Sequence, residues 1–135
     1  RHQQNWGAIE NPAGDLRLAP SFDHASCLGF MLSDAARDDL LSEPDGAGVR
    51  RYSQRARSKF EGRPSPADAA VEALSLLEPA DREHWTEAVL TLTAIASVID
   101  AVPSHRMSAS ARDLASALLT ENHASLSDRL RTMYP

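Results

Sequence analysis

Asn5 and Asp23, near the start of the chain, are residue types that bind a hard metal ion. Between them, strand-like runs at 6–9 and 16–19 flank residues 11–15, which are rich in turn formers. A β-hairpin here would place the start of its first strand beside the end of its second, so both side chains could reach one ion. An amide oxygen and a carboxylate leave most of a Mg²⁺ octahedron open for water and phosphate oxygens. The pair therefore predicts a phosphoryl-transfer site, although both residue types also serve as turn caps.

Each residue of this pair lies within a short segment that can be compared with known motifs. The first reads Arg1-His2-Gln3-Gln4-Asn5-Trp6-Gly7, and the second reads Leu18-Ala19-Pro20-Ser21-Phe22-Asp23-His24. Together they resemble the D-x-H-x-x-N-[WF] loop and the later L-x-P-x-[FY]-D segment of HipA-like kinases. The matching positions are His2, Asn5 and Trp6 in the first motif and Leu18, Pro20, Phe22 and Asp23 in the second. The resemblance is specific over residues 1–29 and looser beyond residue 33.

The resemblance implies the C-terminal helical lobe of a protein-kinase-like fold, with ATP and Mg²⁺ as cofactors. It implies that Asn5 and Asp23 bind the metal and that His2 supports the catalytic loop. The implied reaction transfers the ATP γ-phosphoryl group to a Ser or Thr hydroxyl of a protein, in one form as the toxin of a toxin–antitoxin pair. The positions implied to contact the nucleotide are Arg1, His2, Phe22, Asp23 and His24.

One departure from the family pattern affects the expected activity. The catalytic Asp of the family belongs one position before Arg1, so we read the chain as a fragment. Lys59, the one lysine, is too far downstream to be the amine that pairs with the α- and β-phosphates. We therefore expect these 135 residues alone to lack kinase activity.

Two alternatives stay open. Lipid kinases of the phosphatidylinositol type share a D-R-H-x-x-N loop and a following D-F-G, but their hairpin is shorter and they carry a Gly where this chain has His24-Ala25. A protein substrate is therefore favoured. In the other alternative the chain is an inactive remnant or a helical protein-interaction module, and Asn5 and Asp23 are turn residues.

Composition excludes several classes of protein. The 135 residues suit one domain, and the apolar runs are too short to span a bilayer, which excludes a membrane protein. The net charge of −5 argues against a protein that neutralises a nucleic-acid backbone, so nucleic acid would be met only through a partner. Cys27 is the single cysteine, which excludes an internal disulfide and favours a reducing, cytoplasmic setting.

A basic run lies in the middle of the chain and predicts a docking face for an acidic substrate or antitoxin, a phosphorylated loop or nucleic acid. The alternative is a solvated helix whose arginines pair with acidic neighbours. Within the run, Glu61 is the single acidic residue. The basic residues are Arg50, Arg51, Arg55, Arg57, Lys59 and Arg63, with the first three and Arg57 as the expected contacts.

The pattern divides the chain into a catalytic and metal-binding hairpin with its loop, 1–32, and a helical body, 33–135. The body begins with a short helix from Ser33 to Leu41, ended by the breaker at 43–46. The structure of the basic segment that follows is left open. The fold class is mainly α with a short N-terminal β-hairpin, and about five helices are expected.

Three further helices are expected in the body. One begins at Ser65, with Pro66 at its first position and an apolar face made by Ala67, Ala70, Val71, Leu74 and Leu77. A second covers about 80–101, and its apolar residues surround the axis, as in a buried helix. The last begins at Ser108 or Ser110 and carries side chains at a spacing of four: Leu114, Leu118, Asn122, Leu126 and Leu130.

Overall fold

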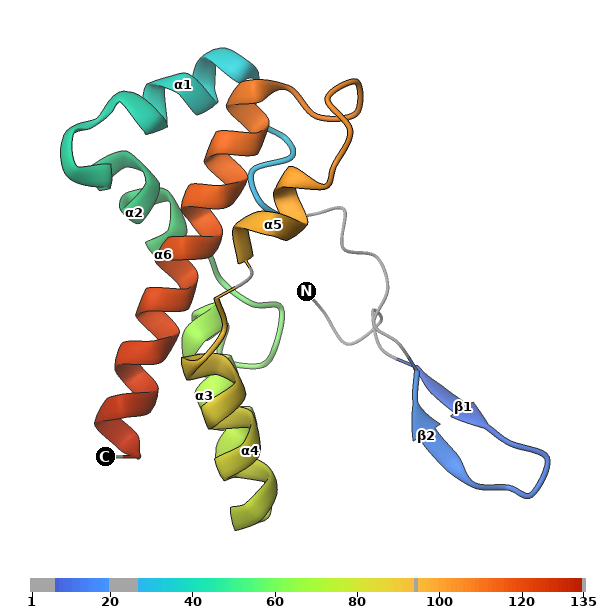
Figure 1. Ribbon diagram of the computed structural model, residues 1–135. Coiled ribbons are helices and arrows are strands. Elements are labelled where there is room, and N and C mark those ends of the chain that lie inside the picture. The colour runs from blue at the N-terminus through green and yellow to red at the C-terminus, as the bar shows by residue number, and fades with distance from the viewer. Residues whose placement is uncertain (1–6, 20–26, 94, 135) are drawn as a thin grey trace.

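The computed structural model describes residues 7–19, 27–93 and 95–134, and it is mainly helical with an N-terminal antiparallel hairpin (Figure 1). This confirms the expected fold class at that level. In chain order the elements are β1 (Ala8–Glu10), β2 (Leu16–Leu18), α1 (Asp34–Ser42), the 3₁₀ helix η2 (Pro44–Gly46), α2 (Ala47–Gln54), α3 (Pro66–Ser75), α4 (Pro79–Leu90), α5 (Ile95–Asp100) and α6 (Ala109–Met133).

The hairpin forms where the sequence predicts it. Its strands pair antiparallel, with Ala8 opposite Leu18. The turn is closed by the Asn11 side chain, whose Oδ1 accepts from the backbone N–H groups of Ala13 and Asp15 at 2.9 and 3.0 Å. Asn11 is a turn former for this reason: its side-chain oxygen takes the place of a backbone acceptor. Among the described elements, β1 and β2 pack only against each other, and the hairpin extends away from the helices (Figure 1).

The long helix α6 is the centre of the helical body. All the other α-helices, α1 to α5, pack against it, and they are distributed along its length (Figure 1). Among the described residues, the large side chains that are completely buried are Leu114 and Leu130, and both belong to α6. One core cluster joins Leu114 and Leu118 to Val49 of α2. The body is therefore a layer of short helices around one long helix.

The two ends of α6 bury different faces. A helix turns by about 100° per residue, so Leu130 lies about 160° around the axis from Leu114. Leu114 faces the cluster with α1 and α2, whereas the C-terminal half lies beside α3 and α4. The predicted spacing of four thus contains two half-stripes, and between them Asn122 is exposed and Leu126 is half-buried. Asn122 instead accepts a hydrogen bond from Ser53 of α2 at 2.6 Å.

Three helix starts follow the sequence signals. Ser33, Ser65 and Ser108 are the N-caps of α1, α3 and α6, and each Oγ accepts from the backbone N–H three residues later. These bonds satisfy donors that the first turn of a helix leaves without a partner. The choice between two starts for the last helix is settled in favour of Ser108.

The single buried helix expected over about 80–101 is wrong. The chain forms α4 and α5 with a break between them, and Leu92 and Val98 are 49% and 67% exposed. The apolar residues surround the axis of the single expected helix because they belong to two separate helices. Each of these helices contacts α6 at a different position along its length. The carbonyl of Val89 in α4 lies 2.7 Å from His123, whereas that of Ile99 in α5 accepts from Arg112.

The basic segment, for which no structure was predicted, contains α2. Gly48 allows this helix to lie against α1, because a Cβ at that position would come 2.4 Å from the carbonyl oxygen of Leu40. The next residue, Val49, is buried in the core cluster. Over the part of the chain that is described, no helix is both long and apolar enough to cross a bilayer.

The core position of Leu114 gives the first prediction. Leu114→Ala should lower the free energy of unfolding by about 2–5 kcal/mol, because it leaves a cavity at a completely buried site. The matched control is Leu76→Ala, at a leucine that is 83% exposed, with an expected change within about 0.5 kcal/mol. Urea unfolding followed by circular dichroism measures both, and equal effects of the two substitutions would contradict the core assignment.

Candidate functional site

In the sequence, the two expected metal ligands lie just outside the paired strands of the hairpin. Beyond the strands, the N–H of Ala19 donates to the carbonyl of Gly7 at 2.8 Å, so the two chain segments remain paired up to these residues. Gly7 is two positions after Asn5, and Ala19 is four positions before Asp23. The expected site residues themselves lie outside the described residues: Arg1, His2, Asn5, Phe22, Asp23 and His24.

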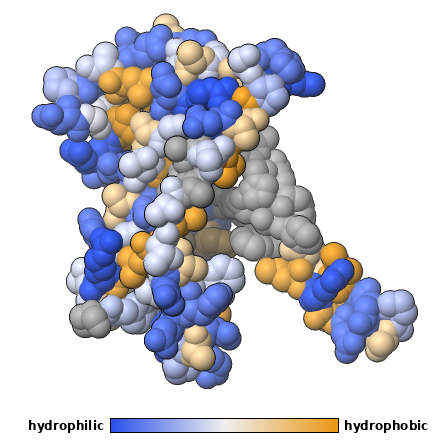
Figure 2. Space-filling model, in the orientation of Figure 1, coloured by the Kyte–Doolittle hydropathy of each residue, from blue (hydrophilic) through white to orange (hydrophobic). Residues whose placement is uncertain are grey.

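The hairpin carries apolar side chains on its surface. Leu16 and Leu18 are 71% and 69% exposed and lie on one face, and Ile9, on the other face, is 39% exposed. Figure 2 shows these apolar side chains on the projecting hairpin. A two-stranded hairpin is marginally stable when no other layer covers it. Because no other described element covers this hairpin, the pairing of Gly7 with Ala19 depends on the hydrogen bonds within the hairpin itself.

A tight turn fixes the chain shortly after Asp23. Gly29 has a φ of 73° and is buried, and a Cβ there would come 2.9 Å from the side chain of Leu114. Leu28 before it also has a left-handed backbone, with a φ of 56°. The preference for glycine at position 29 thus has two causes, the left-handed conformation and the close approach to α6. This turn joins the segment that carries Asp23 to the core.

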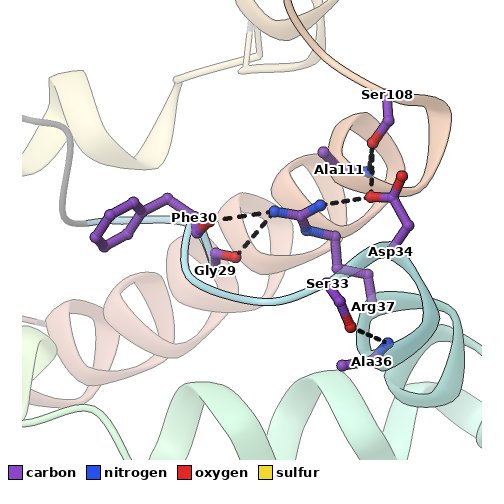
Figure 3. Close-up of polar contacts among 8 residues, drawn as sticks. All are labelled: Gly29, Phe30, Ser33, Asp34, Ala36, Arg37, Ser108 and Ala111. Atoms are coloured by element: carbon purple, nitrogen blue, oxygen red, sulfur yellow. Dashed lines mark hydrogen bonds and ion pairs between the residues drawn. The ribbon is translucent and has the colours of Figure 1, made fainter.

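Arg37 of α1 holds the same turn through polar contacts (Figure 3). Its Nη2 donates to the carbonyls of Gly29 and Phe30 at 3.4 and 3.3 Å, and its Nη1 donates to Asp34 Oδ1 at 2.5 Å. The same carboxylate oxygen accepts from the hydroxyl of Ser108, the N-cap of α6, at 2.8 Å. We call Asp34, Arg37 and Ser108 the polar clamp. It connects the turn, α1 and the start of α6.

The clamp alters the titration of Asp34. The hydrogen bond from Ser108, and after it the one from Arg37, hold the pKa of Asp34 below its ordinary value of 3.8. Both partners favour the charged carboxylate, since a hydrogen bond to an anion stabilises it. The Arg37 side chain is only 13% exposed, and a buried guanidinium of this kind needs acceptors. Asp34 and the carbonyls of Gly29 and Phe30 are the acceptors for its Nη1 and Nη2, whereas its Nε is buried without a partner in the described ranges.

The arginines of the basic run differ in whether they have a carboxylate partner. Arg51 forms a bidentate pair with Glu43, and the Nε of Arg50 lies 3.8 Å from Glu121 on α6. Arg55 is exposed, and its side chain has no hydrogen bond or ion pair with any residue in the described ranges. Two of the four expected docking contacts are thus partly neutralised within the chain, as the alternative interpretation anticipates.

Two hollows flank the C-terminal half of α6. One, of about 540 Å³, lies against α3 and is lined by Val71, Glu72, Met133 and their neighbours. The other, of about 530 Å³, lies beside the loop between α2 and α3 and contains Arg57, Arg63 and Arg129. Sequence reasoning gave Arg129 no role. No local signal marks it, because the loop and α3 residues that it meets there, such as Arg63 and Asp68, are more than sixty positions away along the chain.

Metal-binding side chains do not gather elsewhere in the described ranges. No group of three or more His, Cys, Asp or Glu side chains within residues 7–19, 27–93 and 95–134 is arranged to hold an ion. The expectation of Mg²⁺ therefore rests on Asn5 and Asp23. Their amide and carboxylate oxygens suit that ion in donor chemistry.

Comparison of the chain with protein-family models, with curated proteins and with solved structures finds no match. The assignment to HipA-like kinases therefore rests on the two motifs within residues 1–29 and on the physical arguments around them.

The polar clamp predicts a defined pH dependence. Because the pKa of Asp34 is lowered on folding, its contribution to stability is complete above 3.8 and is lost as the pH falls through the lower folded value. Asp34→Asn should therefore lower the melting temperature at pH 7, and the difference from the unsubstituted chain should shrink below pH 3.8. Thermal unfolding across this pH range measures it.

The control for this experiment is Asp38→Asn on the same helix. The Asp38 side chain is exposed and forms no hydrogen bond or ion pair with any residue in the described part of the chain, so its replacement should change the melting temperature little. A difference for Asp34→Asn that stays constant down to pH 2 would show that the carboxylate charge does not act through the clamp.

Proposed function

We propose that the chain is the C-terminal, mainly helical lobe of a HipA-like serine/threonine kinase. In this proposal Asn5 and Asp23 bind Mg²⁺, which neutralises charge between the β- and γ-phosphates of ATP. His2 supports the catalytic loop, and Arg1, Phe22 and His24 contact the nucleotide. The γ-phosphoryl group passes to a Ser or Thr hydroxyl of a protein in a cytoplasmic setting, with a toxin–antitoxin pair as one context.

The observation that carries the proposal is the register of the hairpin. The bond between Ala19 and Gly7 continues the pairing past both strands, on the side where the two motifs lie. A metal site built from two separate motifs needs that convergence, because its ligands stand 18 positions apart in the sequence. A hairpin shifted by one residue would exchange the faces of every side chain on one strand. The pairing supports the proposal, because it brings Gly7 and Ala19, which stand next to the two motifs in the sequence, together.

Two further features support a lobe of a larger enzyme. The exposed leucines of β2 would be covered if another lobe packed on the hairpin, and apolar surface of this kind often marks an interface. The tight turn and the polar clamp attach the segment after Asp23 to α6. In the proposal this attachment, six residues after Asp23 in the sequence, would limit how far the metal ligand moves when nucleotide binds.

Metal binding by the chain itself can be tested with Mn²⁺, which broadens the NMR signals of nearby nuclei and takes oxygen ligands like those of Mg²⁺. We expect the amide signals of Gly7 and Ala19 to lose intensity well before that of Gly14, which lies in the turn at the far end of the hairpin. Asp23→Asn should remove this effect, because a neutral amide replaces the anionic ligand.

The matched control is Asp15→Asn, which removes a carboxylate from the turn of the same hairpin. This variant should leave the broadening of Gly7 and Ala19 unchanged. Broadening that survives Asp23→Asn, or that is uniform along the hairpin, would refute the metal assignment and favour the interaction-module alternative.

Activity gives the second test. In a longer chain that carries the family's catalytic Asp immediately before Arg1, Asn5→Ala or Asp23→Ala should lower phosphoryl transfer at least about 100-fold, because each removes a ligand of the metal that stabilises the transition state. Transfer of ³²P from ATP to protein Ser or Thr measures the effect. Asp15→Asn serves again as the control, and full activity in either alanine variant would exclude the proposed roles.

A further inference from the structure

The hollow beside the loop between α2 and α3 is rich in charge. It measures about 530 Å³ and is bordered by that loop, the start of α3 and the middle of α6. Three arginines line it: Arg57 and Arg63 from the loop and Arg129 from α6. Two carboxylates, Asp68 and Glu121, also line it. The question is which of these charges already have partners.

Both carboxylates are matched by other groups. Asp68 forms an ion pair with Arg129 and accepts a hydrogen bond from the hydroxyl of Ser65 at 2.6 Å. Glu121 lies 3.8 Å from Arg50, which is outside the lining of the hollow. Neither Arg57 nor Arg63 has an ion pair with an acidic side chain in the described ranges. Arg57 lies close enough to Asp68 to help lower the pKa of that carboxyl, but three arginines share the hollow with only two carboxylates, so its lining carries an excess of positive charge.

Arg57 is oriented by the backbone. Its Nη1 donates to the carbonyls of Gln54 and Ala56, both at 2.7 Å. These two acceptors occupy one corner of the guanidinium. The remaining N–H groups form no hydrogen bond with any residue in the described ranges. Because a guanidinium presents five donors in a planar fork, the others can serve a ligand in the hollow.

Arg63 is held by the loop that carries it. The loop is closed by two backbone bonds, from Ser58 to Pro64 at 2.9 Å and from Arg63 to Phe60 at 3.0 Å, and Ser58 is buried. Arg63 itself has a left-handed backbone with a φ of 48°, which is uncommon for a residue with a side chain. The Arg63 side chain has no partner in the described ranges.

We propose that this hollow binds a phosphomonoester group, with Arg57 and Arg63 as its main contacts. A phosphomonoester carries a charge of about −1.5 to −2 near neutral pH and three acceptor oxygens, which match two arginines better than a single carboxylate would. An extended nucleic acid is disfavoured by the net charge of −5. The hollow has room for more than the phosphate, so the group is carried by a peptide side chain or a small organic molecule. The proposal is independent of the kinase assignment.

The test is a titration of the 135-residue chain by calorimetry and by ¹H–¹⁵N NMR. The probes are inorganic phosphate, a five-residue peptide with a central phosphoserine, the same peptide unphosphorylated, and a single-stranded oligonucleotide. We expect inorganic phosphate and the phosphoserine peptide to shift the amide signals of residues 57–68 and those near 121–129. Arg57→Gln and Arg63→Gln should each weaken binding at least about tenfold, because each removes charge-assisted hydrogen bonds.

The matched control is Arg55→Gln, at an exposed arginine of the same segment that does not line the hollow. It should keep the affinity of the unsubstituted chain. Arg63→Lys retains the charge without the planar fork and should give an intermediate loss, which separates ligand contact from a folding defect. A circular dichroism spectrum of each variant checks the fold.

Each outcome decides the proposal. If the phosphopeptide binds more tightly than inorganic phosphate, the ligand is a phosphorylated protein. If inorganic phosphate binds as tightly as the phosphopeptide, the ligand is a small phosphate compound. Both results support the site. The proposal would be overturned if the unphosphorylated peptide bound as tightly as the phosphopeptide, or if the oligonucleotide bound more tightly than the phosphopeptide. It would also be overturned if neither inorganic phosphate nor the phosphopeptide bound, or if both glutamine variants kept full affinity.

Discussion

Covering the two buried faces of α6 is the constraint on which the rest of the structure depends. The body is small, and its completely buried large side chains, Leu114 and Leu130, lie about 160° apart around this one helix. No single layer of short helices could cover both. The chain therefore places α1, α2 and α5 against the N-terminal half and α3 and α4 against the other half. The short helices of the body are therefore all positioned by their contacts with α6.

The polar clamp is an example of that dependence. Ser108 both caps α6 and donates to Asp34, so the start of α6 and the start of α1 share one carboxylate. Arg37 then carries this arrangement to the turn at Gly29, whose close contact with Leu114 requires the absence of a side chain. If the proposed metal site exists, its second ligand is connected to the core by this route, over six residues.

Charge is organised by the same packing. The run of arginines reads as one basic segment in the sequence, but α2 and its loop turn the members toward different neighbours. Arg50 and Arg51 meet carboxylates, and Arg57 and Arg63 line a hollow with Arg129. Because an ion pair at the surface stabilises weakly, the pairs contribute little to stability, but they decide where positive charge remains for a ligand.

The sequence by itself determined the hairpin and the three serine caps, because turn formation and capping depend on atoms within about four residues of each other. The metal ligands Asn5 and Asp23 stay a prediction from two motifs, and both lie outside the described residues. The sequence did not determine the break between α4 and α5, the helix α2 or the two buried faces of α6. These depend on contacts between residues far apart in the chain, such as Val89 with His123. The arginine-lined hollow belongs to the second kind as well. Arg57 and Arg129 stand 72 positions apart, and only the packing of the α2–α3 loop against α6 brings them into one site.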